Sequence, residues 1–470
     1  TLVKRNSPYL IGRSGLTLET GKTFTIEPGV VIKFVSSNEP TFYVKGTIKL
    51  LGTTEDPVVF TSFYDDEYGG DMNGDGICDK TNASSTAACP FAGSWRRIHL
   101  FSSSVGSEFD NTIIRYGGRW FNDGSPRSMV AVEKTDVIIR NSTFEYSYKY
   151  GLQLFGGGGL IENNVFQNNN VDVDSAGLIA TGGATIRGNT FNNNYIGLAL
   201  QSSTATVENN IFNNNKSYAV DVSSGLASFV GNGGGGNGKN GIIIRGQLNA
   251  TTSPFVMHKN ELPYLIGSGV YETLEIPNKS IVDVDAGVFF KSQTDGIIRV
   301  NGVLNINGNS KESVVFGPLR DDESASDWWR GINVGKTGLL NGKGFTVRRA
   351  GVGCPWGTAC AGIVVDEGKI NIENARFDNN YTTGVRLYKS VGSTLSDVEF
   401  INHNEPTLPA NDALRVIGLS IINSDIGLGV LSFSNNTLGA YSTNSTISHI
   451  DSYSVDFSGN IVNSLPPDLF

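Results

Sequence analysis

The segment Asn-Asn-Val-Phe-Gln-Asn-Asn at residues 163–169 returns with small changes as Gly-Asn-Thr-Phe-Asn-Asn-Asn at 188–194 and as Asn-Asn-Ile-Phe-Asn-Asn-Asn at 209–215. An earlier relative, Asn-Ser-Thr-Phe, occupies residues 141–144. The phenylalanines of these segments, which recur at intervals of 22, 25 and 21 residues, are Phe144, Phe166, Phe191 and Phe212. A self-similar period of this length is typical of a solenoid, in which each repeat forms one coil that packs on its neighbours.

Each phenylalanine is followed by a short run in which apolar and polar residues alternate, as they do in a half-buried strand. These runs lie at residues 152–154, 171–173, 198–200 and 220–222. The asparagines between the runs suit tight corners, because Asn tolerates a left-handed backbone better than most residues other than glycine. In stacked coils the same asparagines would lie above one another and form amide ladders. A disordered polar linker is the alternative, but the regular apolar positions argue against it.

The repeat resembles the right-handed parallel β-helix, the fold shared by pectate-lyase-like enzymes and many secreted repeat proteins. That resemblance implies an all-β solenoid with Phe, Val and Leu side chains stacked inside the coils. Composition agrees with this fold class, since only 17% of the 470 residues are charged and 58 are glycine, a balance that favours strands and turns over helices.

Composition also limits the classes of molecule that the protein is expected to bind. The net charge is −9 and there is no basic run, so we expect no nucleic-acid partner. No apolar segment approaches the ~20 residues that a membrane-spanning helix needs. The sequence begins at Thr1 without a signal peptide, and we interpret it as a mature, processed or excised chain of a secreted or cell-surface protein.

The second half of the chain repeats the first. Val-Val-Phe at residues 58–60 returns at 314–316 with an offset of 256, whereas Trp95 matches Trp329 with an offset of 234. The difference of 22 residues marks an insertion in the first copy, which we place within residues 66–95. Order and spacing therefore predict two tandem homologous β-helix modules.

We place the first module, with its inserted loop, at residues 1–250 and the second at 251–470. The glycine-rich stretch at 231–238 precedes this boundary and is typical of a flexible connection. The sequence leaves open whether the two modules stack end to end or are hinged.

The insertion contains a candidate metal site in the run Asp-Met-Asn-Gly-Asp-Gly-Ile-Cys-Asp at residues 71–79. Oxygen side chains at alternate positions, with glycine at the sixth, let a short loop wrap a hard cation. The run resembles the Asp-X-Asn-X-Asp-Gly calcium loops of dockerin-type and thrombospondin-type repeats. We therefore predict one bound Ca²⁺, with Asp71, Asn73, Asp75, Ile77 and Asp79 as its ligands.

This loop departs from the EF-hand pattern, because its twelfth position is Asn82 instead of glutamate. A bidentate ligand would have to come from Asp79, or from Asp65 or Asp66 just upstream. A polar glycine-rich loop that binds nothing is the alternative.

The four cysteines form two close pairs, Cys78/Cys89 and Cys354/Cys360, both in loops rich in Gly, Pro and Ala. Such pairs predict two disulfides and hence an oxidising compartment. Four free thiols in a cytosolic protein are the alternative, which we disfavour because an exposed free thiol is reactive.

The sequence contains no clear set of catalytic residues. Glycosidases need two or three carboxylates facing one another across a groove. If residues 171–173 form a strand, Asp172 and Asp221 would lie in one outward row, two coils apart, with Asp174 beside them. Because an outward Asp is the ordinary occupant of a strand facing water, we favour solvated side chains over a catalytic group.

Other chemistry-bearing residues form no recognisable site. The four histidines, which are dispersed and lack metal-ligand spacing, are His99, His258, His403 and His449. Trp95 and Trp329 occupy matched places in the two copies, and we expect them to anchor packing instead of stacking on a sugar.

These observations favour a non-enzymatic extracellular or cell-surface protein. It would act as a rigid β-helix rod in an envelope layer, filament or adhesin, and it would self-associate or bind other surface proteins. The second hypothesis is a polysaccharide-degrading or glycan-binding protein that uses the outward face near Asp172, Asp174 and Asp221. A phage tail-spike segment is a third, weaker one.

Overall fold

Strands in the first half of the chain recur in groups of three, and each strand pairs in parallel with the third strand after it. The computed structural model describes residues 1–35, 40–79, 88–119, 126–267, 273–294, 296–320, 328–352, 360–403 and 417–465. Its contacts define two compact units, Thr1–Ile242 (unit 1) and Ile243–Phe470 (unit 2), whose boundary lies inside β25 (Lys239–Gln247). The homology of the two predicted modules stays a prediction.

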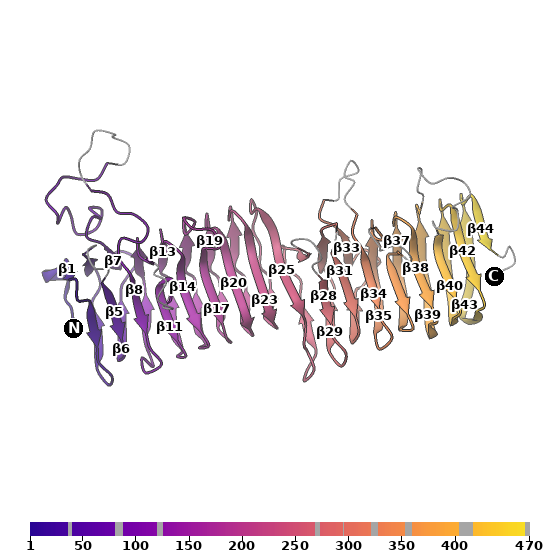
Figure 1. Cartoon of the computed structure of the whole chain (residues 1–470), viewed down its shortest axis with the longest axis horizontal. Coiled ribbons are helices and arrows are strands. Elements are labelled where there is room, and N and C mark those ends of the chain that lie inside the picture. The colour runs from indigo at the N-terminus through magenta and orange to yellow at the C-terminus, as the bar shows by residue number, and fades with distance from the viewer. Residues whose placement is uncertain are drawn as a thin grey trace. The chain divides into compact units, whose positions relative to one another are not determined.

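Unit 1 is a parallel β-helix with three sheets, and each coil contributes one strand to each sheet (Figure 1). Sheet B contains β1 (Tyr9–Ile11), β4 (Val31–Phe34), β7 (Val58–Ser62), β10 (Thr112–Arg115), β13 (Thr143–Glu145), β16 (Val165–Gln167), β19 (Thr190–Asn192) and β22 (Ile211–Asn213). Sheet C contains β2 (Leu16–Leu18), β5 (Thr41–Val44), β8 (Arg97–Leu100), β11 (Ser128–Glu133), β14 (Tyr150–Phe155), β17 (Ala176–Thr181), β20 (Ile196–Ser203) and β23 (Tyr218–Gly225). Sheet A contains β3 (Thr23–Ile26), β6 (Thr47–Leu51), β9 (Glu108–Asp110), β12 (Val137–Arg140), β15 (Gly159–Glu162), β18 (Thr185–Arg187), β21 (Thr206–Glu208) and β24 (Ser228–Val230), and one 3₁₀ turn, η1 (Lys4–Asn6), precedes β1.

Unit 2 begins with three strands per coil and continues with two, because neighbouring lines of strands merge into long ones. The first line is β26 (Phe255–Met257), β29 (Ile281–Asp285) and β32 (Val303–Asn307), and the second is β27 (Tyr264–Ile266), β30 (Phe289–Ser292) and β33 (Val314–Pro318). The long strands are β35 (Leu339–Arg348), β37 (Lys369–Asp378), β39 (Val391–Ile401), β41 (Asp425–Ser434) and β43 (Thr446–Ser458). The remaining line is β28 (Thr273–Ile276), β31 (Ile297–Val300), β34 (Gly331–Val334), β36 (Ile363–Asp366), β38 (Thr383–Tyr388), β40 (Ile417–Ile422), β42 (Leu438–Thr443) and β44 (Val462–Leu465).

The predicted aromatic column is confirmed. Phe144, Phe166, Phe191 and Phe212 are aligned in sheet B and fully buried, with ring centroids 4.9, 4.9 and 4.7 Å apart in nearly parallel planes. These separations match the spacing between adjacent strands, so each coil places its ring directly above the last. In unit 2 a second column has centroid separations of 5.3, 5.0 and 5.1 Å and comprises Phe377, Phe400, Phe433 and Phe457.

Amide ladders form as predicted, two of them among the described residues of unit 1, but the asparagines next to the left-handed corners build them and not the corner asparagines themselves. In one ladder each side-chain Nδ2 donates to the Oδ1 of the next coil at 3.0, 2.9 and 3.0 Å, through Asn164, Asn189, Asn210 and Asn232. The other has distances of 2.9, 3.1 and 2.8 Å and comprises Asn169, Asn194, Asn215 and Asn237. The corners beside them have positive φ angles between 53° and 58° at Asn163, Asn168, Asn193, Asn209 and Asn214.

One predicted strand was wrong. Residues 171–173 form a bend before β17, and Val171 and Val173 are 57% and 64% exposed. The inward position belongs instead to Leu178, which pairs with Leu152 of the previous coil. Leu178 follows Phe166 by 12 residues, whereas Leu152 follows Phe144 by 8, so a longer connection shifted the strand along the chain. No helix among the described residues is long and apolar enough to cross a membrane.

Candidate functional site

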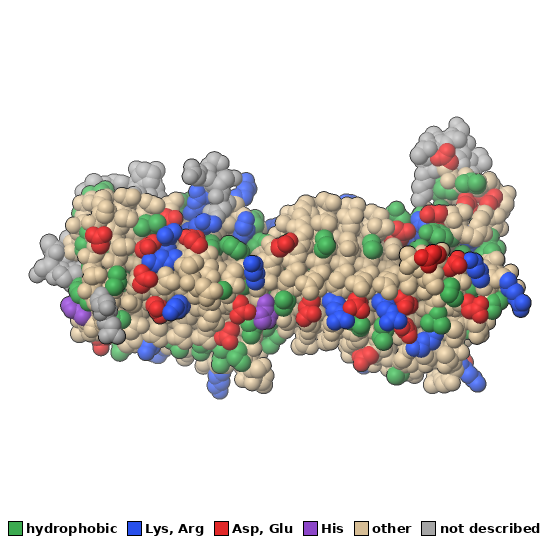
Figure 2. Space-filling model, turned by 180° about the vertical axis from the view of Figure 1, so that it is seen from behind, with side chains coloured by type: hydrophobic (Ala, Val, Ile, Leu, Met, Phe, Trp, Pro, Cys, Tyr) green, Lys and Arg blue, Asp and Glu red, His purple; other side chains and the backbone are tan. Residues whose placement is uncertain are grey.

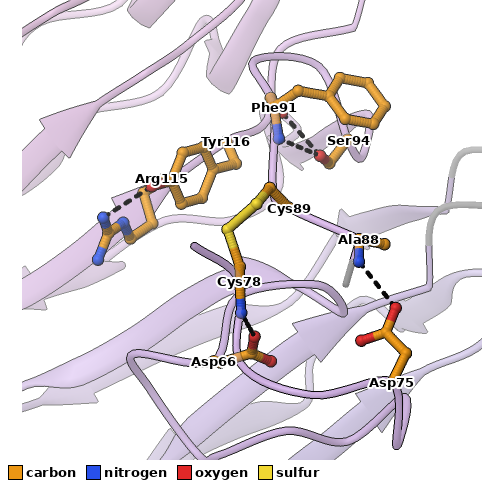
Figure 3. Close-up of a disulfide and its surroundings, with 9 residues drawn as sticks. All are labelled: Asp66, Asp75, Cys78, Ala88, Cys89, Phe91, Ser94, Arg115 and Tyr116. Carbon is orange, nitrogen blue, oxygen red and sulfur yellow. Dashed lines mark hydrogen bonds between the residues drawn. A yellow bond between two sulfur atoms is a disulfide. The ribbon is translucent and has the colours of Figure 1, made fainter. Parts of the chain in front are cut away.

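The inserted loop is closed by the predicted Cys78–Cys89 disulfide (Figure 3). A carboxylate oxygen of Asp66 accepts a hydrogen bond from the backbone N–H of Cys78 at 2.8 Å. Asp75 does the same for Ala88, also at 2.8 Å. The carboxylates of Asp66 and Asp75 and the Cys78–Cys89 disulfide therefore hold the two ends of the loop together.

The second predicted pair, Cys354 and Cys360, lies only partly within the described residues. Among the described residues one complete disulfide is present, Cys78–Cys89, where the sequence predicted two. Cys360 lies just before β36, and its backbone carbonyl accepts a hydrogen bond from the Thr382 hydroxyl at 2.6 Å. Cys354 lies outside the described residues, so its bond to Cys360 stays a prediction.

The five predicted calcium ligands lie in the inserted loop, and Asp71 organises its first turn. Its two carboxylate oxygens accept hydrogen bonds from the backbone N–H groups of Gly74 and Gly76, at 2.7 and 2.9 Å. Buried oxygens of Asp66 and Asn73 have no hydrogen-bond partner in the described part of the chain. Within that part, no three His, Cys, Asp or Glu side chains gather as a metal-binding group. The calcium assignment therefore stays a prediction.

A buried charged network lies between the start of this loop and sheet B. The ammonium group of Lys33, on β4, donates to the carbonyl oxygens of Asp65 and Gly70 at 2.8 and 2.6 Å. Arg115, on β10, pairs with Glu67 of the loop at 2.6 Å and with Glu145 of β13 at 3.1 Å. The loop is thus held against the outer surface of the sheet by two cations.

Burial and neighbouring charges shift the pKa values of Asp65, Lys33 and Arg115 in this network. Burial raises the pKa of the Asp65 carboxyl, although the hydrogen bond from Thr61 works against this. Burial lowers the pKa of Lys33, and the nearby Asp65 carboxylate opposes that change. For Arg115 burial is outweighed by the carboxylates of Asp65 and Glu145, which raise its pKa. Because the Lys33 side chain is fully buried and committed to backbone carbonyls, we interpret this network as a loop anchor, not as a reaction centre.

The three candidate carboxylates do not share a row. The outward row of sheet C runs through Gln153, Ile179, Ala199 and Asp221, so Ile179 occupies the place predicted for Asp172. Asp172 lies in the bend before β17, where it pairs with Lys149 at 2.9 Å, and Asp174 occupies a left-handed corner with φ 63°. The predicted placement of Asp172 and Asp174 on a strand was therefore wrong, for the same reason as the strand itself.

The tryptophan prediction is confirmed. Trp95 and Trp329 are fully buried, and the indole N–H of each donates to a backbone carbonyl, of Arg115 at 2.8 Å and of Arg348 at 2.9 Å. Neither ring is open to a sugar. Figure 2 shows small mixed groups of acidic and basic side chains on the face drawn, without a broad patch of one sign.

A groove that the sequence did not reveal lies on unit 2. It has a volume of about 680 Å³ and follows the outer face of β29, β32, β35, β37 and β39. Successive coils place polar side chains at matched positions along its floor, in the order Asp283, Asn305, Asn341, Asn371 and Thr394.

The floor of the groove is one continuous hydrogen-bonded ladder. Asn305 donates to Asp283 at 2.7 Å, and Asn341 donates to Asn305 at 3.0 Å. Asn371 then donates to Asn341 at 2.9 Å, and the hydroxyl of Thr394 donates to Asn371 at 3.2 Å. The ladder lies on the outside of the coils and is half-buried, unlike the interior ladders of unit 1.

A second outward row borders this ladder and carries charge. Lys343 and Glu373 lie in it on adjacent coils and pair at 2.9 Å. Asp397 lines the same groove and pairs with Lys311 at 2.8 Å, and Lys311 also pairs with Glu399 at 2.8 Å. The Lys343–Glu373 pair joins adjacent coils, whereas Lys311, from the turn between β32 and β33, reaches β39 along one edge of the groove.

Comparisons with known proteins agree with the fold. The sequence model for a right handed beta helix region matches residues 98–256. The fold is a right-handed parallel β-helix. No curated protein matches the chain.

Solved structures similar to the β-helix include the PL6-family alginate lyase AlyGC, with 11% identity, a TM-score of 0.22 and coverage of 97% of this chain and 96% of that one. A point mutant of the same enzyme has 10% identity, a TM-score of 0.22 and coverage of 96% of both chains. The catalytic unit of a GH87 α-1,3-glucanase from Streptomyces thermodiastaticus strain HF3-3 has 13% identity, a TM-score of 0.21 and coverage of 78% of this chain and 63% of that chain.

Proposed function

We propose that this is an extracellular β-helix protein that binds a linear polysaccharide along the groove of unit 2, without cleaving it. The observation that carries this proposal is the outward ladder from Asp283 to Thr394, which repeats a polar group once per coil along the groove. Adjacent coils are about 4.8 Å apart, a rise similar to that of one sugar unit in an extended chain. The ladder therefore offers successive sugars equivalent contacts.

The hydrogen-bonding inventory of the ladder supports this use. An Asn side chain has two N–H donors and an oxygen with two lone pairs. Asn305, Asn341 and Asn371 each spend one donor and one acceptor position on the ladder itself. Each is left with one N–H and one lone pair that the ladder does not use, and a sugar hydroxyl, which both donates and accepts, matches that pair.

Replacing Asn341 with alanine tests the groove. We expect the affinity for the bound oligosaccharide to fall about five- to tenfold, because hydrogen bonds of roughly 1 kcal/mol are lost in the middle of the ladder. Isothermal titration with oligosaccharides found by glycan-array screening measures this. The matched control is Asn333→Ala on β34, which is equally half-buried but lies outside the groove lining. Equal affinities for wild type and Asn341→Ala would contradict the proposed site.

We also propose that the β-helix acts as a stiff support for the groove. Continuous aromatic columns and amide ladders resist bending within each unit, and we propose that they present the groove in an envelope layer, filament or adhesin. The Cys78–Cys89 disulfide supports an oxidising, extracellular location. Self-association belongs to this proposal, and light scattering with and without Ca²⁺ tests it: a monomer under every condition would exclude a filament.

We further propose that the inserted loop of unit 1 binds one Ca²⁺. The two unpartnered buried oxygens, of Asp66 and Asn73, are the kind of group that a hard cation satisfies. Asp71 would contribute a carboxylate from the turn it already organises, with Asp75, Ile77 and Asp79 completing the predicted ligand set. The bound cation would hold the loop to the sheet beside the Lys33 and Arg115 anchors.

Saturating Ca²⁺ is expected to raise the melting temperature of the wild-type protein by several degrees. At a concentration 100 times the dissociation constant the native state gains about 2.7 kcal/mol. The Asp71→Ala variant should lose this response while keeping the disulfide, and Mg²⁺ serves as the control cation. Identical melting curves in Ca²⁺ and in chelator would reject the site.

A further inference from the structure

The charges around the unit 2 groove restrict which polysaccharide it accepts. Among the residues that line it are three carboxylates, Asp283, Glu373 and Asp397, and one ammonium, Lys343. Lys343 is already paired with Glu373 at 2.9 Å, so its charge is neutralised within the protein. The lining therefore has a net negative charge, in a chain whose own net charge is −9.

Lys311, which pairs with the groove residue Asp397, is also committed. Lys311 lies between Asp397 and Glu399, at 2.8 Å from each, and its side chain is only 16% exposed. Arg376, on β37, pairs with Glu399 at 2.8 Å and with Glu312 at 2.7 Å. Each cation along this edge thus faces at least one carboxylate of the protein, and an incoming anion would have to displace it.

A polyuronate carries a carboxylate on every sugar, and carboxylates only accept hydrogen bonds. In this groove it would meet the carboxylate of Asp283, while Lys343, the one cation in the lining, is already paired with Glu373, so it would be repelled. A neutral polysaccharide brings hydroxyls, which satisfy both the remaining N–H and the remaining lone pair of each ladder amide. We infer that the ligand of the unit 2 groove is a neutral, hydroxyl-rich polysaccharide and not a polyuronate, an inference that rests on the proposed glycan-binding function.

The inference is tested by titrating the full chain with three classes of oligosaccharide of equal length at low ionic strength. The neutral class comprises cellulose, xylan, mannan and β-1,3-glucan oligosaccharides, the anionic class alginate and polygalacturonate oligosaccharides, and the cationic class chitosan oligosaccharides. We expect at least one neutral ligand to bind ten or more times more tightly than any anionic one, and no less tightly than the cationic one. Its affinity should change little with added salt, because no net charge is neutralised on binding.

The isosteric variant Asp283→Asn separates charge from shape, since Asn keeps an oxygen that accepts the hydrogen bond from Asn305. The ratio of its affinity for polygalacturonate to its affinity for the neutral ligand should rise above that of wild type, because the variant removes one negative charge from the groove. Tighter binding of an anionic or cationic ligand than of every neutral one, weakened at least fivefold by Asn341→Ala, would overturn the inference and leave the glycan-binding proposal standing. Failure of all three classes to bind would instead reject the proposed function.

Discussion

Replacing Asn194 with alanine is expected to lower the free energy of unfolding of unit 1 by about 3 kcal/mol or more. The side-chain oxygen of Asn194 accepts from the backbone N–H of Asn169 at 3.2 Å and from its side chain at 2.9 Å. Its own amide donates to the carbonyl of Phe166 at 2.9 Å and to Asn215 at 3.1 Å. Alanine removes all four bonds at a fully buried position, and each orphaned donor or acceptor costs roughly 1–3 kcal/mol there.

The neighbouring residue provides a control for this prediction. Asn193 is exposed and has a φ of 55°, a left-handed conformation that glycine adopts without steric strain. Asn193→Gly should therefore change stability by less than about 1 kcal/mol, although it alters the same Asn-Asn pair. Urea denaturation gives both values, and hydrogen exchange at the Asn169 amide localises the effect. Equal stabilities of the two variants would show that the ladder contributes no more than an ordinary corner.

The parts of this fold that could be predicted are those in which each coil repeats the one before it. Phe166 and Phe191 stack because the strand spacing leaves room for one ring per coil. The regular recurrence of phenylalanine in the sequence predicts this arrangement. The asparagine corners follow from the same periodicity, since few residues accept a left-handed backbone. The Cys78–Cys89 disulfide was predictable because both cysteines fall in one short loop.

The number of residues per coil varies along the chain, and this variation prevented prediction of the other features of the fold and of the groove. The bend at Asp172 alternates polar and apolar residues as a strand does, and only the 12-residue step from Phe166 to Leu178 distinguishes it. The unit 2 groove is harder still, because its ladder joins residues separated in sequence by 22, 36, 30 and 23 positions. Without a constant period, the sequence does not specify which outward residue lies above which. The anchoring of the inserted loop by Lys33 is likewise a long-range contact between elements with no shared pattern.

One interior ladder contains a histidine where its neighbours have asparagine. In unit 2 the Nδ2 of Asn380 lies 3.2 Å from Nε2 of His403, and Nδ1 of His403 lies 2.8 Å from Oδ1 of Asn436. Because an amide oxygen only accepts, Nδ1 carries the proton and Nε2 accepts from Asn380. The neutral ring therefore joins the ladder in one defined orientation, whereas a protonated ring would turn a second donor toward the amide N–H of Asn380.

Acidification is expected to destabilise unit 2 through this histidine. Burial lowers the pKa of His403 from 6.5 to about 4. Since the folded protein binds the proton less readily than the unfolded chain, the stabilising contribution is complete above pH 6.5. It is lost as the pH falls from 6.5 toward 4, by about 3 kcal/mol in total.

Comparing the pH dependence of the free energy of unfolding in wild type and in His403→Asn isolates this effect. Asparagine restores the ladder residue found elsewhere and has no titratable group, so the variant's stability should vary less with pH over this range. The variant loses some packing, but that loss is the same at every pH and does not alter the slope. Burial also lowers the pKa of His99, whose contribution has the same sign but is present in both proteins and cancels in the difference. Parallel curves for the two proteins between pH 6.5 and 4 would show that His403 is not responsible for acid sensitivity.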